Sequence, residues 1–168
     1  MPFTSEQAQF LAQFLLTDYE REREITRRVI AAVPVGQEEY KPSEKCMPAL
    51  KLAWHLAGSE WFFLNGVING GFSPGGDMPD TIKSGADIVQ WYDAQLPPLV
   101  EKAKALNGDA VNQVVDFFGV WQAPALVFLQ LMLKHSSHHR GQLSSYLRPM
   151  GAKVPSIYGP SADVEIKR

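Results

Sequence analysis

The chain has 168 residues, of which 45% are hydrophobic and 20% are charged. Its 16 Lys and Arg residues nearly balance its 18 Asp and Glu residues, so the net charge is only -2. This balance argues against a nucleic-acid partner, because proteins that bind nucleic acids usually carry a basic excess or a basic stripe. The length suits one globular domain with a sizeable core, and we expect this domain to cover residues 1–168.

The sequence shows no sign of secretion or of a membrane span. The amino-terminal segment Met-Pro-Phe-Thr-Ser-Glu-Gln lacks the basic and apolar regions of a secretory signal. The most apolar run, Ala123 to Leu133, is too short to cross a bilayer and contains Gln130. Since Cys46 is the single cysteine, no intrachain disulfide can form. We therefore expect a cytoplasmic protein with no membrane partner.

The first predicted helix starts after Thr4, which forms a capping-box pattern with Gln7. Pro34 and Gly36 predict its end near residue 33. A stripe at helical spacing is expected to face the core, and it consists of Leu11, Phe14, Asp18, Glu22, Ile25 and Val29.

The second predicted helix has Pro48 in its first turn and ends between Gly66 and Gly71. A loop rich in Gly and Pro follows over residues 70–80. The inward stripe of this helix consists of Leu52, His55, Ser59 and Phe62.

The third predicted helix opens at Ser84, which has Asp87 three residues later. The pair Pro97-Pro98 lies inside its pattern and predicts a break or sharp kink near Gln95. The helix is expected to resume beyond this break and to stop at Asn107-Gly108.

The segment Val111 to Trp121 is less regular, and its apolar residues favour a short strand or hairpin. Pro124 starts the fourth and most apolar helix, which is expected to run to about Arg148. The tail from Gly151 onward contains several Pro and Gly residues and is expected to be extended. Four helices with longer middle connections predict an all-α fold, a four-helix bundle.

Three of the four histidines lie close together in the fourth helix. His135 and His139 are four residues apart on its inward stripe, so they share one face and can chelate one ion. His138 lies on a more polar face and should point elsewhere. His55 sits on the apolar stripe of the second helix, and a bundle can bring it to the same depth.

Two interpretations of the inward histidines remain open at this point. Three neutral imidazoles with an open position suit a zinc or nickel ion, which would satisfy His55, His135 and His139 together. Alternatively, the three side chains form a hydrogen-bonded polar cluster without metal.

The sequence around these histidines resembles that of the DinB/YfiT-like family. The similar segments are His135-Ser-Ser-His-His-Arg-Gly-Gln-Leu143, the residues around His55 from Leu52 to Trp61, and the closing stretch from Gly151 to Ser161. The resemblance implies an up-down-down-up four-helix bundle, often a homodimer, with a metal site of three histidines. Its ligands fall on His55, His135 and His139, while His138 matches an extra histidine that is not usually a ligand.

The resemblance also implies a chemistry, because characterised members of this family include thiol S-transferases and a thiol-dependent isomerase. The first function hypothesis is therefore a metal-dependent transferase that uses a low-molecular-weight thiol on a small-molecule substrate. Asp18 or Glu22 would orient a ligand or accept a proton if the first helix packs beside the site. In the alternative interpretation, both carboxylates simply reach solvent.

Two other function classes remain open. A metal-assisted hydrolase would need a general base beside the metal, yet Ser136 follows His135 where a His-Glu-x-x-His motif has Glu. Glu60 also points away from the stripe of His55. The third class is a non-catalytic module that binds a metal or small ligand. Cys46 is a weaker nucleophile candidate, because it precedes His55 by about nine residues, more than two helical turns.

Overall fold

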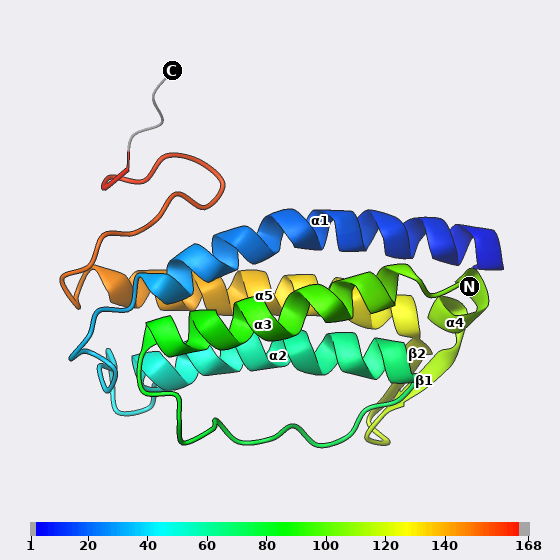
Figure 1. Ribbon diagram of the computed structural model, residues 1–168, viewed down its shortest axis with the longest axis horizontal. Coiled ribbons are helices and arrows are strands. Elements are labelled where there is room, and N and C mark those ends of the chain that lie inside the picture. The colour runs from blue at the N-terminus through cyan, green and yellow to red at the C-terminus, as the bar shows by residue number, and fades with distance from the viewer. Residues whose placement is uncertain (1–2, 165–168) are drawn as a thin grey trace.

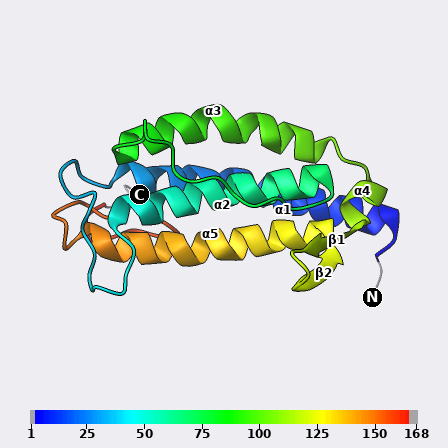
Figure 2. The same ribbon diagram turned by 90° about the horizontal axis from the view of Figure 1, so that it is seen from below.

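Four long helices lie side by side in the computed structural model, which describes residues 3–164 (Figure 1). They are α1 (Ser5–Ala31), α2 (Ala49–Asn69), α3 (Gly85–Lys104) and α5 (Ala125–Leu147). Helices α1 and α5 run in one direction, and α2 and α3 run in the other (Figures 1 and 2). The predicted all-α bundle and its up-down-down-up topology are therefore confirmed. None of the described helices is long and apolar enough to cross a membrane.

The helix starts predicted from capping residues are confirmed. Thr4 and Gln7 form a complete capping box before α1, with the Gln7 N–H 3.2 Å from the Thr4 hydroxyl. Ser84 and Asp87 form the same arrangement before α3. Helix α2 ends at Gly70, whose φ of 63° lies in the left-handed region that a side chain would disfavour.

The predicted break at Pro97-Pro98 is wrong, because α3 continues through both prolines (Figure 2). The two prolines remove donors for the carbonyl groups of Asp93 and Ala94, one turn earlier. Both of these residues are exposed, so water can hydrate the freed carbonyl groups. The opposite side of the same turn carries Leu96, which is fully buried and holds the helix on the core.

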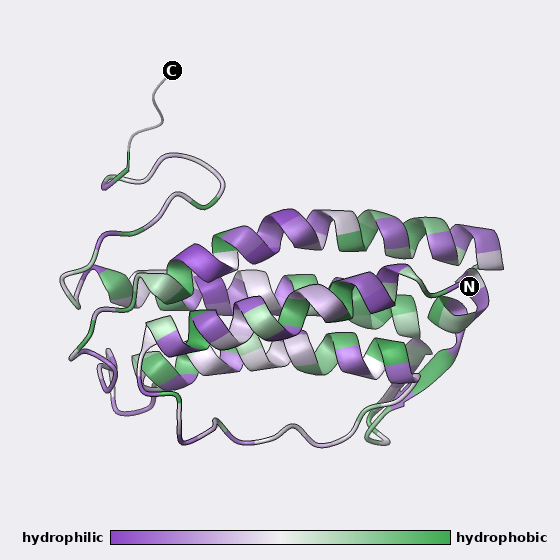
Figure 3. Ribbon diagram, viewed as in Figure 1, coloured by the Kyte–Doolittle hydropathy of each residue, from purple (hydrophilic) through white to green (hydrophobic). Residues whose placement is uncertain are grey.

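The predicted inward stripe of α1 is also wrong in phase. Phe14 is 63% exposed, Phe10 is 68% exposed, and Asp18 is exposed. Figure 3 shows hydrophobic and hydrophilic residues alternating on the visible surface of the first half of α1. The residues that face the core are instead Ala8, Ala12, Leu16, Tyr19, Thr26, Val29 and Ile30. In the first turns this face consists of Ala8 and Ala12, whose small side chains are a weaker hydrophobic signal than Phe10 and Phe14 nearby.

Helices α2 and α3 run parallel, so the chain must return along the length of the bundle between them (Figure 1). Residues 70–84 make this return, and the Gly- and Pro-rich part is a loop as predicted. Another short segment joins α3 to α5. It consists of α4 (Gly108–Asn112) and an antiparallel hairpin of β1 (Val114–Phe117) and β2 (Trp121–Pro124), which confirms the hairpin expected there.

A buried carboxyl group joins three of the long helices. Glu60 of α2 is fully buried, and its Oε2 accepts hydrogen bonds from the hydroxyls of Tyr19 at 2.7 Å and of Tyr92. Burial raises the pKa of Glu60 above its ordinary value of 4.5, although both tyrosine hydroxyls oppose this shift. A raised pKa means that the carboxyl group releases its proton less readily in the folded protein than in the unfolded chain.

Replacing Glu60 with Gln should therefore change how stability depends on pH. In the natural chain, this carboxyl group contributes fully to the free energy of unfolding below pH 4.5, and the contribution is lost as the pH rises through the raised pKa. Glu60→Gln keeps an acceptor for the tyrosines and removes the ionisation, so its stability relative to the natural chain should increase between pH 5 and pH 8. Urea denaturation at both pH values measures this.

The control is Glu60→Leu, which leaves two tyrosine hydroxyls without an acceptor. Relative to Glu60→Gln, it should cost about 2–3 kcal/mol at either pH, because neither replacement side chain ionises. Parallel pH profiles for the natural chain and Glu60→Gln would contradict a raised pKa.

Candidate metal centre

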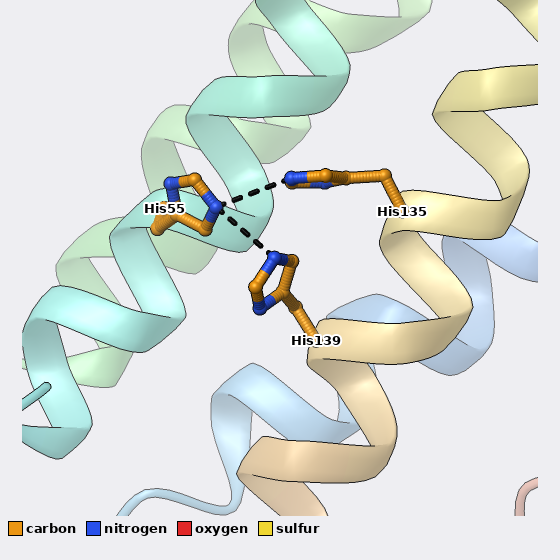
Figure 4. A group of neighbouring side chains, drawn as sticks. All are labelled: His55, His135 and His139. Atoms are coloured by element: carbon orange, nitrogen blue, oxygen red, sulfur yellow. Dashed lines mark hydrogen bonds between the residues drawn. The ribbon is translucent and has the colours of Figure 1, made fainter. Parts of the chain in front are cut away.

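Three histidines from two helices meet inside the bundle (Figure 4). The Nε2 atom of His55 on α2 lies 3.2 Å from Nε2 of His135 and 3.3 Å from Nε2 of His139, both on α5. Their potential ligand atoms all lie within 4.8 Å of one another. Within residues 3–164, no other group of three or more His, Cys, Asp or Glu side chains is close enough to share an ion. The structure thus brings together the three residues that the sequence singles out.

The helices position these side chains through ordinary spacing and packing. Four residues separate His135 from His139, which places both rings on one face of α5. Helix α2 packs along this face and supplies His55. Buried apolar residues on the two helices keep them together, and they include Leu52, Leu56, Met132 and Leu143.

A serine determines which nitrogen of His135 carries the proton. Ser59 donates its hydroxyl proton to the carbonyl oxygen of Leu56 at 3.0 Å, so the hydroxyl oxygen can only accept elsewhere. This oxygen lies 3.2 Å from Nδ1 of His135, and Nδ1 must therefore be the donor. The lone pair on Nε2 of His135 is left facing the other two histidines.

Gln142 determines the proton position on His139 in the same way. Its Oε1 lies 3.1 Å from Nδ1 of His139, and since an amide oxygen only accepts, Nδ1 donates. The Nε2 lone pair of His139 then also points to the centre. The Nε2 atom of His55 faces both lone pairs but can carry only one proton, so hydrogen bonding satisfies only one of them. A divalent cation accepts all three lone pairs, and the donor set therefore fits a metal ion.

Burial favours the neutral form that coordinates metals. It lowers the pKa of His55, and the neighbouring His139 lowers it further. Burial, with smaller contributions from the other histidines, lowers the pKa of His135 to about 4. Both rings are therefore neutral near pH 7, as coordination requires.

The remaining candidates from the sequence lie outside this centre. His138 is exposed on α5, as its helical phase predicts, and Asp18 is exposed on α1. Glu22 forms an ion pair with Arg140, which is 1% exposed, and accepts a hydrogen bond from Tyr158 at 2.7 Å. Neither acidic residue of α1 is part of the group of potential ligands, and Glu22 does not simply reach solvent.

Cys46 is half-buried in the segment before α2 and does not belong to the histidine group. Its Sγ lies 3.2 Å from the hydroxyl of Ser43. Hydrogen bonds from Ser43 and from Tyr146 lower the pKa of this thiol. The cysteine is thus somewhat more acidic than usual, but it is no partner of the candidate ligands.

A cavity of about 540 Å³ opens beside the centre, between α2, α3 and the loop that joins them. His55 and Ser59 line it, together with the aromatic rings of Trp54, Trp61 and Trp91. Small-molecule sites in proteins commonly have volumes of about 300–1,000 Å³. His55 therefore borders both the histidine centre and a cavity large enough for a ligand.

The sequence places Ser59 on the inward stripe of the second helix, but it assigns neither Ser59 nor Gln142 a role as the hydrogen-bond partner of a histidine. The signal that points to them is helical spacing, because Ser59 follows His55 by one turn and Gln142 follows His139 by one turn. Arg140 is harder to foresee, since an arginine that follows the exposed His138 by two residues is normally expected in solvent.

An up-down-down-up bundle with three converging histidines between its second and last long helices defines a recognisable class of helical proteins. The sequence profile of the DinB family matches residues 8–165, and the chain belongs to this family. The resemblance stated from the histidine segments is therefore confirmed.

Two uncharacterized proteins of Bacillus subtilis (strain 168) are similar in sequence. YjoA is 25% identical over 130 residues, which cover 77% of this chain and 84% of YjoA. YrdA is 24% identical over 149 residues, which cover 88% of each chain.

Two crystal structures of DinB-like proteins share the fold. YjoA of Bacillus subtilis superposes with a TM-score of 0.71 at 23% identity, over 85% of this chain and 96% of YjoA. A protein from Bacillus cereus ATCC 10987 superposes with a TM-score of 0.72 at 24% identity, over 86% of this chain and 95% of the other. At this identity the structural likeness establishes the fold.

Proposed function

We propose that His55, His135 and His139 bind one divalent metal ion, with zinc or nickel preferred, in a metal-dependent thiol S-transferase. The observation that carries the proposal is the convergence of three imidazole nitrogens, two of them with their protons held on the far side of the ring by Ser59 and Gln142. Three neutral nitrogen ligands with room for further ligands are typical of catalytic sites.

An ion held by His55, His135 and His139 would supply one effect, which is to stabilise the sulfur of a low-molecular-weight thiol as thiolate at neutral pH. The sulfur then forms a bond to an electrophilic carbon of a small-molecule substrate, and the leaving group departs with its electron pair. The thiol proton goes to solvent. The side chains of the protein hold the ring nitrogens in place and provide the neighbouring cavity bordered by His55.

The two alternatives have less support. A metal-assisted hydrolase needs a general base near the metal, and among the described residues no carboxylate joins the histidine group. Glu60 is held by two tyrosines, and Glu22 is held by Arg140. A non-catalytic module that binds a metal or small ligand is the second alternative, and turnover distinguishes it from the enzyme.

The test uses protein purified without chelator or histidine tag and loaded with zinc or nickel. We expect common bacterial thiols to change the absorption spectrum of a cobalt-substituted sample, because sulfur joins the coordination. We also expect at least one thiol and electrophile pair to turn over in the zinc or nickel protein and not in a His139→Ala variant. If a fully loaded protein shows neither result, the non-catalytic binding module remains as the function.

We further propose a homodimer, which the family resemblance implies. The exposed Phe10 and Phe14 on α1 offer apolar area for a second copy, at 68% and 63% exposure. Light scattering at micromolar concentration should give twice the mass of one chain. A monomer under these conditions would remove this part of the proposal.

A further inference from the structure

The cavity beside His55 has walls made mainly of aromatic rings. Trp54 and Trp61 come from α2, Trp91 comes from α3, and Phe62 lies next to Trp61. The rings of Trp54 and Trp91 have centroids 4.7 Å apart and planes inclined at 61°, so they form two adjoining walls at an angle. All of these rings are only partly buried, which leaves part of their surface free toward the cavity.

Electron-rich ring faces attract positive charge, and tryptophan attracts it most strongly. Several tryptophans around one cavity are the arrangement by which proteins recognise organic ammonium groups. The concentration of three tryptophans at one cavity therefore points to a ligand that carries positive charge.

The charged residues around the cavity agree with this conclusion. Asp77, from the loop between α2 and α3, is the only Asp, Glu, Lys or Arg that lines it within the described part of the chain. The one other titratable side chain among the residues that line the cavity is that of His55. Asp77 makes no ion pair with another residue between 3 and 164. Its carboxylate is therefore available to a cation and would repel an anion.

A glycine inside α2 also fits a ligand site. Gly58 lies in the middle of the helix, where glycine costs about 0.5–1 kcal/mol relative to alanine. A Cβ atom at this position would meet only the Trp54 ring, at 3.7 Å, so packing does not require glycine here. Since Gly58 lines the cavity, its missing side chain leaves space for a ligand.

We propose that this cavity binds a small organic cation, with an ammonium group held among Trp54, Trp61 and Trp91 and close to the loop that carries Asp77. This inference rests on the proposed function and names the class of its substrate, an electrophile with a positively charged group. Its charged end lies among the tryptophans, and its reactive end faces His55.

Three probes of nearly equal shape test the proposal in metal-free protein. They are phenyltrimethylammonium, its uncharged isostere tert-butylbenzene, and the anion benzenesulfonate, and binding is measured by tryptophan fluorescence at low salt. We expect the cation to bind about tenfold more tightly than the uncharged isostere. We expect the anion to bind more weakly than either. Equal binding of the cation and the isostere, or preference for the anion, would overturn the proposal.

Variants assign the effect to this cavity. Asp77→Asn, in an exposed loop, should weaken binding of the cation about threefold and leave the uncharged isostere unchanged. Gly58→Leu should fill the cavity and abolish binding of both. Its control is Gly141→Leu, a second helical glycine whose added Cβ meets nothing within 4 Å, and this variant should bind as the natural chain does. If Gly58→Leu leaves binding unchanged, the probes bind elsewhere and the proposal is wrong.

The metal proposal and the cation proposal can fail separately. Zinc affinity, measured by titration calorimetry in the same variants, should be unaffected by Asp77→Asn. If the protein binds zinc but does not prefer the cationic probe, only the proposed cationic substrate class is wrong. Preference for the cation without zinc binding would overturn the proposed metal-dependent function and leave a cation-binding protein.

Discussion

Replacing His135 or His139 with Ala should lower the affinity for a divalent ion by more than about a hundredfold, because even loss of an outer partner of a ligand costs 10–100-fold. Replacing His55 should have the same effect, although it lies 80 residues before His135. His138→Ala is the matched control, since this histidine is exposed and outside the group. Titration calorimetry with zinc should give a stoichiometry near one for the control.

The hydrogen-bond partners provide a finer test of the same centre. Ser59→Ala and Gln142→Ala remove the acceptors that hold the protons of His135 and His139 on Nδ1. Each substitution should lower the affinity for zinc about tenfold or more without changing the stoichiometry. Loss of the ion in His138→Ala with retention in His139→Ala would contradict this arrangement of α5.

Glu22→Gln should destabilise the fold by about 3 kcal/mol, since removing one partner of a buried ion pair leaves the other charge without compensation. Arg140 is 1% exposed. Besides the carboxylate of Glu22, its guanidinium contacts the backbone oxygen of Glu22 at 3.1 Å and the Thr26 hydroxyl at 3.2 Å. These neutral oxygens cannot replace a carboxylate. For a chain of this size the midpoint of thermal unfolding should fall by roughly 6–12 °C.

Asp93→Asn is the control for this ion-pair prediction. It breaks the contact of Asp93 with Arg27, in which both side chains are more than a third exposed. Water and salt compensate such charges, so the cost should stay below about 1 kcal/mol. Equal midpoints of thermal unfolding for Glu22→Gln and Asp93→Asn would contradict the prediction that buried Arg140 needs the Glu22 carboxylate for stability.

Features that depend on neighbours in the sequence were predictable. Capping boxes at Thr4 and Ser84 mark helix starts, because the side chain and the backbone groups that it satisfies lie within one turn. The same holds for the candidate ligands on α5, where spacing alone separates His138 from His135 and His139. The bundle then only has to bring one further helix against this face.

Features that depend on tertiary contacts were not predictable in the same way. The Pro97-Pro98 pair breaks an isolated helix, yet packing of Leu96 holds α3 continuous while solvent receives the freed carbonyl groups. The inward face of α1 begins with Ala8 and Ala12, which carry a weaker hydrophobic signal than the exposed Phe10 and Phe14. The partners of Arg140 and Glu60 lie far away in the sequence, so neither their burial nor their hydrogen bonds can be derived from local pattern.

The position of the three histidines on two helices also gives the proposed ion a mechanical role. An ion shared by α2 and α5 closes a loop of 80 residues between His55 and His135, much as a covalent staple does. Because the unfolded chain lacks this arrangement, the ion binds only the folded state and shifts the unfolding equilibrium. At a free concentration one hundred times its dissociation constant, it adds about 2.7 kcal/mol. The melting temperature then becomes a gauge of free metal, rising by roughly 5–11 °C between chelated and loaded samples.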